Sequence, residues 1–392
     1  MEIFGYNLDE FLAWVGEDID TVMMLIWILP VIIFVFYGQR IQLIISSNEI
    51  KKDIGKLDEY TTSTKKDFLN YVKTNLTYKS DPSKKLDSFF DYFTIMPVDM
   101  DPNGIISKIN HLVRSREDFI RLQINTMFSN LSSVELSKLQ NLLEIVTTLQ
   151  LFHKYTRHLY LTAKKQKNFP LILPLQMMIP FIMEEAVALK DAMPAIKNGQ
   201  PIGDGIGPMI VGEMMLGTTK ESAAVETVWS KTIFEDRDLF LLKAEGPNAT
   251  VGRPGDGLEK IISIKKPDLI IMIDASLKLE GEDSASIARG KVGVSSRSLG
   301  QLEKDKKGFG AAIGGIGTER FKIEEIATNN QIPILALVVK QSIHEAITLM
   351  TKEIADSAKT VKDELYEMIR ENTSSGQSVL VIGVGNTIGV SQ

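Results

Sequence analysis

Residues 268–274 read DLIIMID, an unbroken apolar run between two aspartates. Three other runs have a similar length and composition: DLFLLKA at 238–244, IPILALVV at 332–339 and SVLVIGV at 378–384. Such runs are typical of strands that are buried on both faces, because helices cover both sides of a parallel sheet. The segments between the runs have helical patterns, at 258–266, 319–329 and 341–371. This alternation predicts an α/β domain over residues 199–392, with a mainly parallel sheet flanked by helices.

The carboxyl ends of these runs are where such a sheet binds a ligand. The run 268–274 ends at Asp274, and the run 378–384 leads into Gly385 and Asn386. The run 238–244 leads into a glycine-rich loop, 246–257, whose backbone N–H groups can face an anion. The candidate anion-binding residues of this loop are Asn248, Thr250, Gly252 and Arg253. The alternative is that its glycines only form turns.

Asp204 lies in the segment PIGDGIGPMIV, residues 201–211, just before the first helix expected in this region. An Asp in that position is normally the N-cap of the following helix, because its carboxylate accepts a hydrogen bond from a free backbone N–H group. Two interpretations of Asp204 therefore stay open, a helix cap and a functional carboxylate.

Three motifs in this half resemble motifs of the hydrogenase maturation endopeptidases and the spore germination protease. GDGIGP at 203–208 resembles their acidic, glycine-containing loop, and PDLIIMIDA at 267–275 resembles their strand that ends in a functional Asp. VIGVGN at 381–386 is similar to the Gly-x-Gly-Asn strand with which those domains usually begin. Because this strand comes last here, the resemblance implies a circularly permuted domain over residues 199–392. The whole chain also resembles a family of membrane-anchored archaeal proteins with no assigned activity.

The peptidase resemblance carries over two catalytic residues, Asp204 and Asp274, and implies that they face one crevice. Two neighbouring carboxylates can share a proton, so that one serves as general base toward water and the other as general acid. This is what the germination protease implies, with Gly383, Gly385 and Asn386 shaping the floor of the substrate site. The maturation endopeptidases instead use two acidic residues and a His around a metal ion.

Arg297 marks the departure from that metal-dependent pattern. It lies in the segment 294–300, where the resemblance would place the His ligand, and a guanidinium does not bind a metal ion at neutral pH. No metal site is therefore predicted, and the sequence does not define a cofactor. Arg297 is instead a candidate for holding a substrate carboxylate or an oxyanion, the alternative being an ordinary surface arginine.

Residues 22–37 are all apolar or aromatic. A bilayer core needs about 17 to 20 such residues in a helix, so we expect a transmembrane helix with an interfacial extension over residues 21–45. The alternative is a buried core helix. Residues 1–20 form a short acidic N-terminus without Lys or Arg, whereas Arg40, Lys51 and Lys52 follow the apolar run. The positive-inside rule then predicts a single-pass protein of the cell membrane, with its N-terminus outside and its C-terminal domain in the cytoplasm.

Residues 46–198 are predicted to form a helical domain, in which SSVE at 132–135 resembles a capping box before a long apolar stripe. Residues 51–168 hold 19 Lys and Arg against 13 Asp and Glu. This stretch can rest on anionic lipid headgroups, the alternative being a solvated helical face. A second apolar run, 169–183, contains three prolines and precedes two glutamates. We therefore expect a packed or interface-lying segment there and no second span.

The composition excludes several functions. The chain has 44 Lys and Arg against 50 Asp and Glu, so it is not a generally basic nucleic-acid-binding protein. It has no Cys, which excludes disulfides, thiolate zinc sites and a cysteine nucleophile. The favoured function is a membrane-anchored, peptidase-like hydrolase that faces the cytoplasm and acts on a protein or peptide. The alternatives are a non-catalytic membrane-tethered module that binds a small anion or nucleotide, and a structural protein that docks a partner.

Overall fold

The computed structural model describes residues 2–3, 6–7, 19–76, 115, 118–128, 131–165, 171–291 and 316–391. The chain divides into two compact units. The first unit comprises Met1–Lys56 and Tyr155–Pro180, and the second comprises Leu57–Lys154 and Phe181–Gln392. The first unit begins with a small antiparallel pair, β1 (Glu2–Ile3) and β2 (Tyr6–Asn7).

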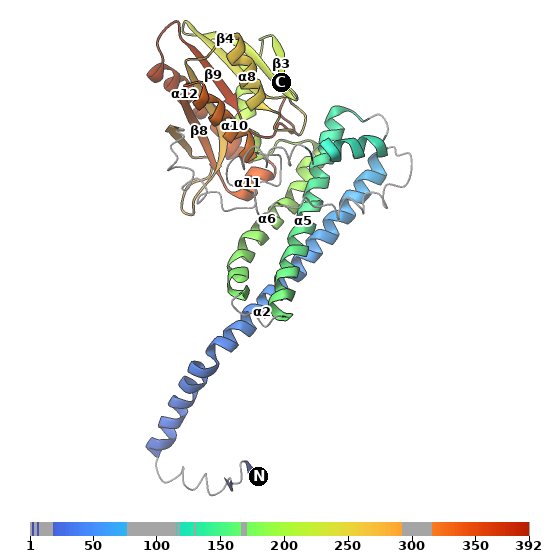
Figure 1. Ribbon diagram of the computed structural model, residues 1–392, viewed down its shortest axis with the longest axis vertical. Helices are drawn as coiled ribbons and strands as arrows, with labels where there is room; N and C mark the ends of the chain where they lie inside the picture. The colour runs from blue at the N-terminus through green and yellow to red at the C-terminus, as the bar shows by residue number, and fades with distance from the viewer. Residues whose placement is uncertain are drawn as a thin grey trace. The chain divides into compact units, whose positions relative to one another are not determined.

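Three long helices contribute residues to both units (Figure 1). They are α2 (Ile19–Asn75), α5 (Ser133–Lys165) and α6 (Ile172–Asn198). Helix α2 is continuous through the predicted span at 21–45, with Pro30 inside it. Helix α6 likewise continues through Pro174 and Pro180, so most of the second apolar run is helical despite its prolines.

Among the described residues, one helix, α6, has the length and apolar composition to cross a membrane. Its most apolar window has a mean hydropathy of 1.5, and 44% of that window is buried in the protein. Core helices of proteins outside membranes meet the same criterion, so this finding alone does not establish a span. The sequence predicts a span at residues 21–45, which belong to α2. Helix α6 is a different helix, further along the chain.

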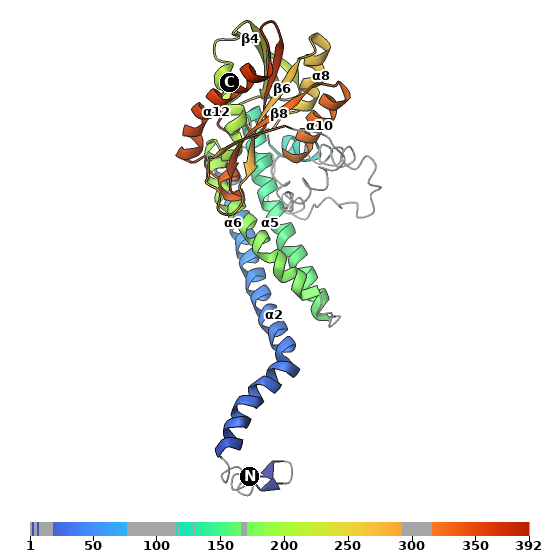
Figure 2. The ribbon, with the colours of Figure 1, turned by 90° about the vertical axis from the view of Figure 1, so that its left-hand side faces the viewer.

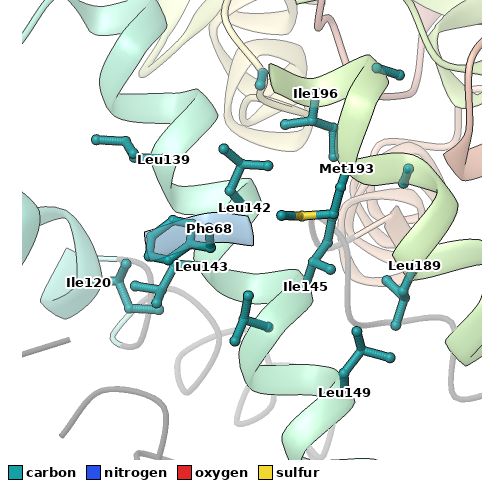
Figure 3. Close-up of a cluster of buried hydrophobic side chains, with 14 of the residues drawn as sticks. Phe68, Ile120, Leu139, Leu142, Leu143, Ile145, Leu149, Leu189, Met193 and Ile196 are labelled. Carbon is teal, nitrogen blue, oxygen red and sulfur yellow. The ribbon is translucent and has the colours of Figure 1, made fainter. Parts of the chain in front are cut away.

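A helical core lies in the second unit. Helix α5 starts with the predicted capping box, because Ser132 N donates to Glu135 Oε2 (2.9 Å) and Glu135 N donates to Ser132 Oγ (3.2 Å). Its apolar stripe is buried against parts of α2, α6 and the helical residues 118–127. Figure 3 shows this cluster, with Phe68, Ile120, Leu139, Leu142, Leu143, Ile145, Leu149, Leu189, Met193 and Ile196.

A seven-stranded mixed sheet fills the described part of the C-terminal half, in the order β3-β4-β5-β9-β6-β8-β7. Its strands are β3 (Lys220–Ala224), β4 (Thr227–Phe234), β5 (Arg237–Ala244), β6 (Leu269–Leu277), β7 (Ile287–Lys291), β8 (Ile334–Gln341) and β9 (Ser378–Gly383). Neighbours among β5, β9, β6 and β8 are parallel, whereas β3–β4, β4–β5 and β7–β8 are antiparallel. The last strand of the chain therefore lies between β5 and β6.

Helices cover both faces of this sheet. On one face α7 (Ile206–Met214) and α12 (Lys352–Asn372) pack on side chains such as Ile271. On the other face α8 (Pro254–Ile264) and α10 (Ile316–Asn329) pack on side chains such as Met272. Figure 2 shows the sheet between α12 and the pair α8 and α10. Because successive residues of β6 enter two different cores, the strand is apolar at every position from Leu269 to Ile273.

The predicted sheet is correct in its four central strands and wrong in being mainly parallel. The four predicted runs correspond to β5, β6, β8 and β9, which pair in parallel. Strands β3, β4 and β7 are not predicted, because they lie at or next to the edges of the sheet and carry polar residues. The predicted helix 341–371 is two helices, α11 (Ile343–Ile347) and α12, because Ser342 and Thr351 each cap a new helix.

Candidate functional site

Asp204 lies in the short 3-10 helix η2 (Gly203–Gly205), directly before α7. The N-cap of α7 is Gly205, and among the described residues no side chain caps that helix, so the helix-cap interpretation of Asp204 is wrong. Its Oδ2 atom instead accepts a hydrogen bond from Asn386 N, at 2.7 Å. Asp204 is 3% exposed. This contact joins the first turn of the C-terminal half to the last turn of the chain.

Asp274 lies on β6 beside the same turn. Ile273 pairs with Gly383 of β9, and Val384 N donates to Ile273 O at 2.9 Å. Asp274 is the next residue along β6 and is 2% exposed. The structure therefore brings Asp204, Asp274 and the glycine turn after β9 together, although they are far apart in the sequence.

Two glycines allow this close approach. Gly385 has a φ of +137°, and a Cβ atom at this position would clash with the carbonyl oxygen of Asp204. A Cβ atom on Gly207 would lie 2.5 Å from both Ile273 O and Val384 O. The beginning of α7 thus lies against the middle of β6 and the end of β9 at a distance that only glycine permits.

Electrostatics couples the two carboxylates. Burial, and after it the charge of Asp274, raises the pKa of Asp204 from its ordinary 3.8, and the hydrogen bond from Asn386 N lowers it, so that the pKa is about 7. A carboxyl group with a raised pKa keeps its proton near neutral pH while its neighbour is ionised. The pair can therefore hold one proton and exchange it with a bound group.

Asn141 of α5 reaches the site from the helical part of the second unit. Asn386 Nδ2 donates to Asn141 Oδ1 at 3.4 Å, and Asn141 Nδ2 donates to Ala249 O at 2.7 Å. Asn386 Oδ1 accepts from Ile388 N at 2.9 Å, which fixes the side chain on its other side. The sequence does not point to Asn141 as part of the site. The one hint is that a polar residue lies among the apolar residues of this helix.

Gln341, at the end of β8, is a second polar residue that the sequence does not identify as part of the site. It is fully buried, and its Nε2 atom donates to Gly203 O at 3.0 Å. This bond holds η2 directly before Asp204. The sequence predicts Gln341 as the first residue of a helix over 341–371. In the structure Gln341 is the last residue of β8, so that prediction does not bring it to the site.

Side chains of the protein itself accept hydrogen bonds from N–H groups of the proposed anion-binding loop. Its backbone N–H groups donate to side chains: Gly252 N to Thr250, Arg253 N to Thr227 and Gly255 N to Glu319. The carboxylate of Glu319 lies 3.1 Å from Gly255 N and so occupies the N-terminus of α8, where an anion would bind. Thr250 Oγ1 donates to a second carboxylate, that of Glu226, at 2.7 Å. Asn248 is buried and its Oδ1 accepts from Ser133 Oγ. These contacts favour the interpretation of the loop as a set of turns.

Three other ionisable residues of this half are Arg297, His344 and Lys243. Arg297 lies outside the described residues. The side chain of His344 is half-exposed, and its Nε2 atom lies 3.2 Å from Asp191 Oδ2. Lys243, at the end of β5, is fully buried, and burial lowers its pKa to about 8. Its Nζ atom donates to Ala244 O at 3.0 Å, so the backbone satisfies part of its hydrogen-bonding capacity.

Comparison with known families matches almost the whole chain. The model of the N-terminal domain of a protein of unknown function, DUF1512, matches residues 24–199. The model of the C-terminal domain of the same family matches residues 202–307 and 301–391. No curated protein and no solved structure matches the chain.

Proposed function

The chain belongs to the DUF1512 family, and we propose that it is a membrane-anchored hydrolase of peptidase-like mechanism. The observation that carries the proposal is the coupling of two buried carboxylates, Asp204 and Asp274, at the carboxyl end of the sheet. Its substrate class is a protein or peptide, because two carboxylates that share a proton can activate water toward an amide bond. The resemblance of GDGIGP, PDLIIMIDA and VIGVGN to peptidase motifs supports the same choice.

In this proposal each carboxylate has its own role. Asp204, whose pKa is about 7, keeps a proton at neutral pH and serves as the general acid toward the leaving amine. In this proposal Asp274 is the general base and takes a proton from the attacking water. The Asn386 N–H group donates to Oδ2 of Asp204 and leaves the other oxygen of that carboxyl to carry the proton. Because both carboxylates are buried, a peptide reaches them only when the surrounding turns move apart.

Anchoring by the N-terminal part of α2 completes this proposal. Its side chains Trp27, Val31 and Ile44 are 75%, 59% and 62% exposed, which suits contact with lipid. The acidic residues before this segment and the basic residues after it support an outside N-terminus and a cytoplasmic C-terminal half. The same sheet domain would then work at the inner face of the cell membrane.

The proposal is tested by cleavage of fluorogenic casein by the full chain in detergent. We expect Asp204→Asn and Asp274→Asn each to lower turnover by about 100-fold or more, because general acid–base catalysis contributes about 10²–10⁴-fold. Asp356→Asn, at an exposed position on α12, is the matched control and should leave turnover unchanged. Equal turnover in all four proteins would exclude the carboxylate pair as the catalytic site.

The burial of both carboxylates also favours a second candidate, a structural protein whose C-terminal half only docks a partner. On that account the pair has only a structural role in the domain. Casein would then remain intact with the wild-type protein, and Asp204→Asn would change stability alone.

A further inference from the structure

One surface of the first unit has no role in the site. It is the hairpin end, which we define as residues 161–165 of α5 together with residues 171–178 at the beginning of α6. Large apolar side chains on it are exposed, namely Leu161, Leu171, Leu173, Met177 and Met178. Met177 is 74% exposed. Exposed apolar side chains gathered on one surface mark a contact with another apolar phase.

Basic residues accompany these apolar side chains. Lys164 and Lys165 are exposed in the last turn of α5. Over residues 155–180 the chain also has Arg157 and Lys167 and contains neither Asp nor Glu. A cationic and apolar surface fits the boundary between anionic headgroups and acyl chains. A soluble protein partner would require acidic groups together with an apolar face of matching shape.

Two side-chain hydrogen bonds fix the level of the hairpin end along α2. Ser47 Oγ lies 3.1 Å from Tyr160 OH, and Gln176 Nε2 donates to Glu49 Oε2 at 3.0 Å. From this level the hairpin runs toward the N-terminal part of α2 (Figure 1). Lys165 is five residues beyond Tyr160, a rise of about 8 Å in an α-helix.

The same rise along α2 from Ser47 leads to residues 41–45, where Ile41, Ile44 and Ile45 are exposed. These residues form the interfacial end of the predicted span at 21–45. The hairpin end and the interfacial end of α2 therefore lie at one level within the first unit. A membrane that surrounds the N-terminal part of α2 would have its surface at this level.

We propose that the hairpin end is a second membrane contact, which inserts into the headgroup region of an anionic bilayer beside α2. This inference rests on the proposed anchoring by α2 and is independent of the carboxylate chemistry. The hairpin lies in the interface without crossing the bilayer, because 44% of the apolar window of α6 is buried in the protein. Two contacts would hold the first unit in a fixed orientation on the membrane, whereas a single helix allows rotation about its axis.

The test uses single cysteines in the full chain, which has no natural Cys. We would label three variants, Met177→Cys, Trp27→Cys and Ile233→Cys, with a polarity-sensitive fluorophore in vesicles of phosphatidylcholine and phosphatidylglycerol. Trp27 reports on the anchor, and Ile233, which is exposed on β4 of the second unit, is the control. Nitroxide lipids with shallow or deep quenchers then report the depth of each probe.

We expect the Met177 probe to be quenched most by shallow nitroxides, the Trp27 probe by deep nitroxides, and the Ile233 probe by neither. A quenched Trp27 probe with an unquenched Met177 probe would overturn the hairpin contact and leave the anchor intact. If neither is quenched, the anchor fails and the hairpin contact fails with it. Blue-shifted but unquenched fluorescence at Met177 would mean contact with protein, such as a second copy of this chain, and would overturn the proposal. Quenching of the Ile233 probe equal to that of Met177 would show unselective adhesion to vesicles and would also overturn it.

Charge reversal separates anionic lipid from a merely apolar contact. Lys164→Glu with Lys165→Glu should reduce quenching of the Met177 probe in vesicles that contain phosphatidylglycerol. The matched control is Lys352→Glu with Lys359→Glu, two exposed positions on α12. Unchanged quenching in the hairpin variant would contradict anionic lipid as the partner.

Discussion

Two regions place side chains where folded proteins rarely have them. The carboxylate site of the second unit buries ionisable groups, whereas the hairpin end of the first unit exposes apolar ones. Asp204 and Asp274 are ionisable groups that lie inside the protein, with exposed fractions of 3% and 2%. Met177 and its neighbours are apolar groups that lie outside, where water would be unfavourable. Buried acids and exposed apolar patches are both uncommon in folded proteins. Proton chemistry is our proposal for the first of these regions, and contact with lipid is our proposal for the second.

The two regions also differ in how they are held. Around the carboxylates, backbone approaches backbone at glycine positions, and Asn386, Asn141 and Gln341 make directed hydrogen bonds. Around the hairpin end, two side-chain hydrogen bonds to α2 set the register and the apolar side chains have no comparable constraint. Substitutions should therefore have large effects on the stability of the first region and small effects on that of the second.

The largest expected effect is on the pH dependence of stability. The pKa of Asp204 is about 7 in the folded protein against an ordinary 3.8, so between these values the folded state binds more protons than the unfolded state. Stability contributed by this group is present below about pH 4 and falls as the pH rises to 7, by up to about 4 kcal/mol. Asp204→Asn removes this loss, so urea unfolding at pH 8 should show the variant to be more stable than the wild type.

The control for this prediction is Asp356→Asn, whose difference from the wild type should not vary with pH. A constant difference between Asp204→Asn and the wild type from pH 4 to pH 8 would show that Asp204 ionises normally.

Gly385→Ala should have the next largest effect. The new Cβ atom meets the carbonyl of Asp204 and the residue must also keep a positive φ, so we expect a loss of about 3 kcal/mol or more in the free energy of unfolding. Gly376→Ala is the matched control, because Gly376 has a φ of +84° but nothing within 4 Å of the new atom. It should lose only about 1–2 kcal/mol from backbone strain. If thermal or urea unfolding shows the same loss of stability for Gly385→Ala and Gly376→Ala, the backbone of Gly385 does not lie close against the Asp204 carbonyl.

Asn141→Ala tests the link from α5 to the site. It removes a donor to Ala249 O and the acceptor for Asn386 Nδ2, and a buried group left without its partner costs about 1–3 kcal/mol. Asn372→Ala, which removes a bond only to Met368 O within its own helix, should cost less. Urea unfolding of both variants measures the difference. A cost for Asn141→Ala no larger than that of the control would show that α5 does not support the site.

Met177→Gln should have the smallest effect. In detergent we expect a change within about 0.5 kcal/mol, because the side chain is exposed and packs on little of the protein. Met193→Gln is the contrast, since Met193 is 2% exposed in the helical core and should lose several times more. A large loss for Met177→Gln would mean that the hairpin end is held by the protein and not by lipid.

The sequence alone predicts the elements that local pattern defines. The four central strands are visible as apolar runs because both of their faces are buried. The roles of Asp274 and Asn386 in a site stay predictions, and β6 continues past Asp274 to Leu277. The capping box at Ser132 and Glu135 is also predictable, because both of its hydrogen bonds join residues three apart in the sequence.

Features that depend on distant contacts are not predictable in this way. Strands β3 and β7 are polar and depend on pairing with a neighbour for their conformation. Asn141 lies 245 residues from its partner Asn386, so no local pattern connects them. The glycine-rich sequence 246–257 by itself predicts an anion-binding loop, but no local pattern shows that Glu319 of a later helix accepts a hydrogen bond from Gly255 N.

Both the proposed catalysis and the predicted pH dependence require Asp204 to hold a proton near neutral pH because it is buried beside Asp274. Infrared spectroscopy of the full chain measures this directly, since a protonated buried carboxyl group has its own C=O band that can be titrated. Burial raises the pKa of a second carboxyl group, Glu185, to about 7 as well, so the measurement is made in a Glu185→Gln background. There we expect a band that disappears with a midpoint of about pH 7 and that is absent when Asp204→Asn is added. If all carboxyl bands of Glu185→Gln have titrated by the ordinary range near pH 4, Asp204 does not hold this proton.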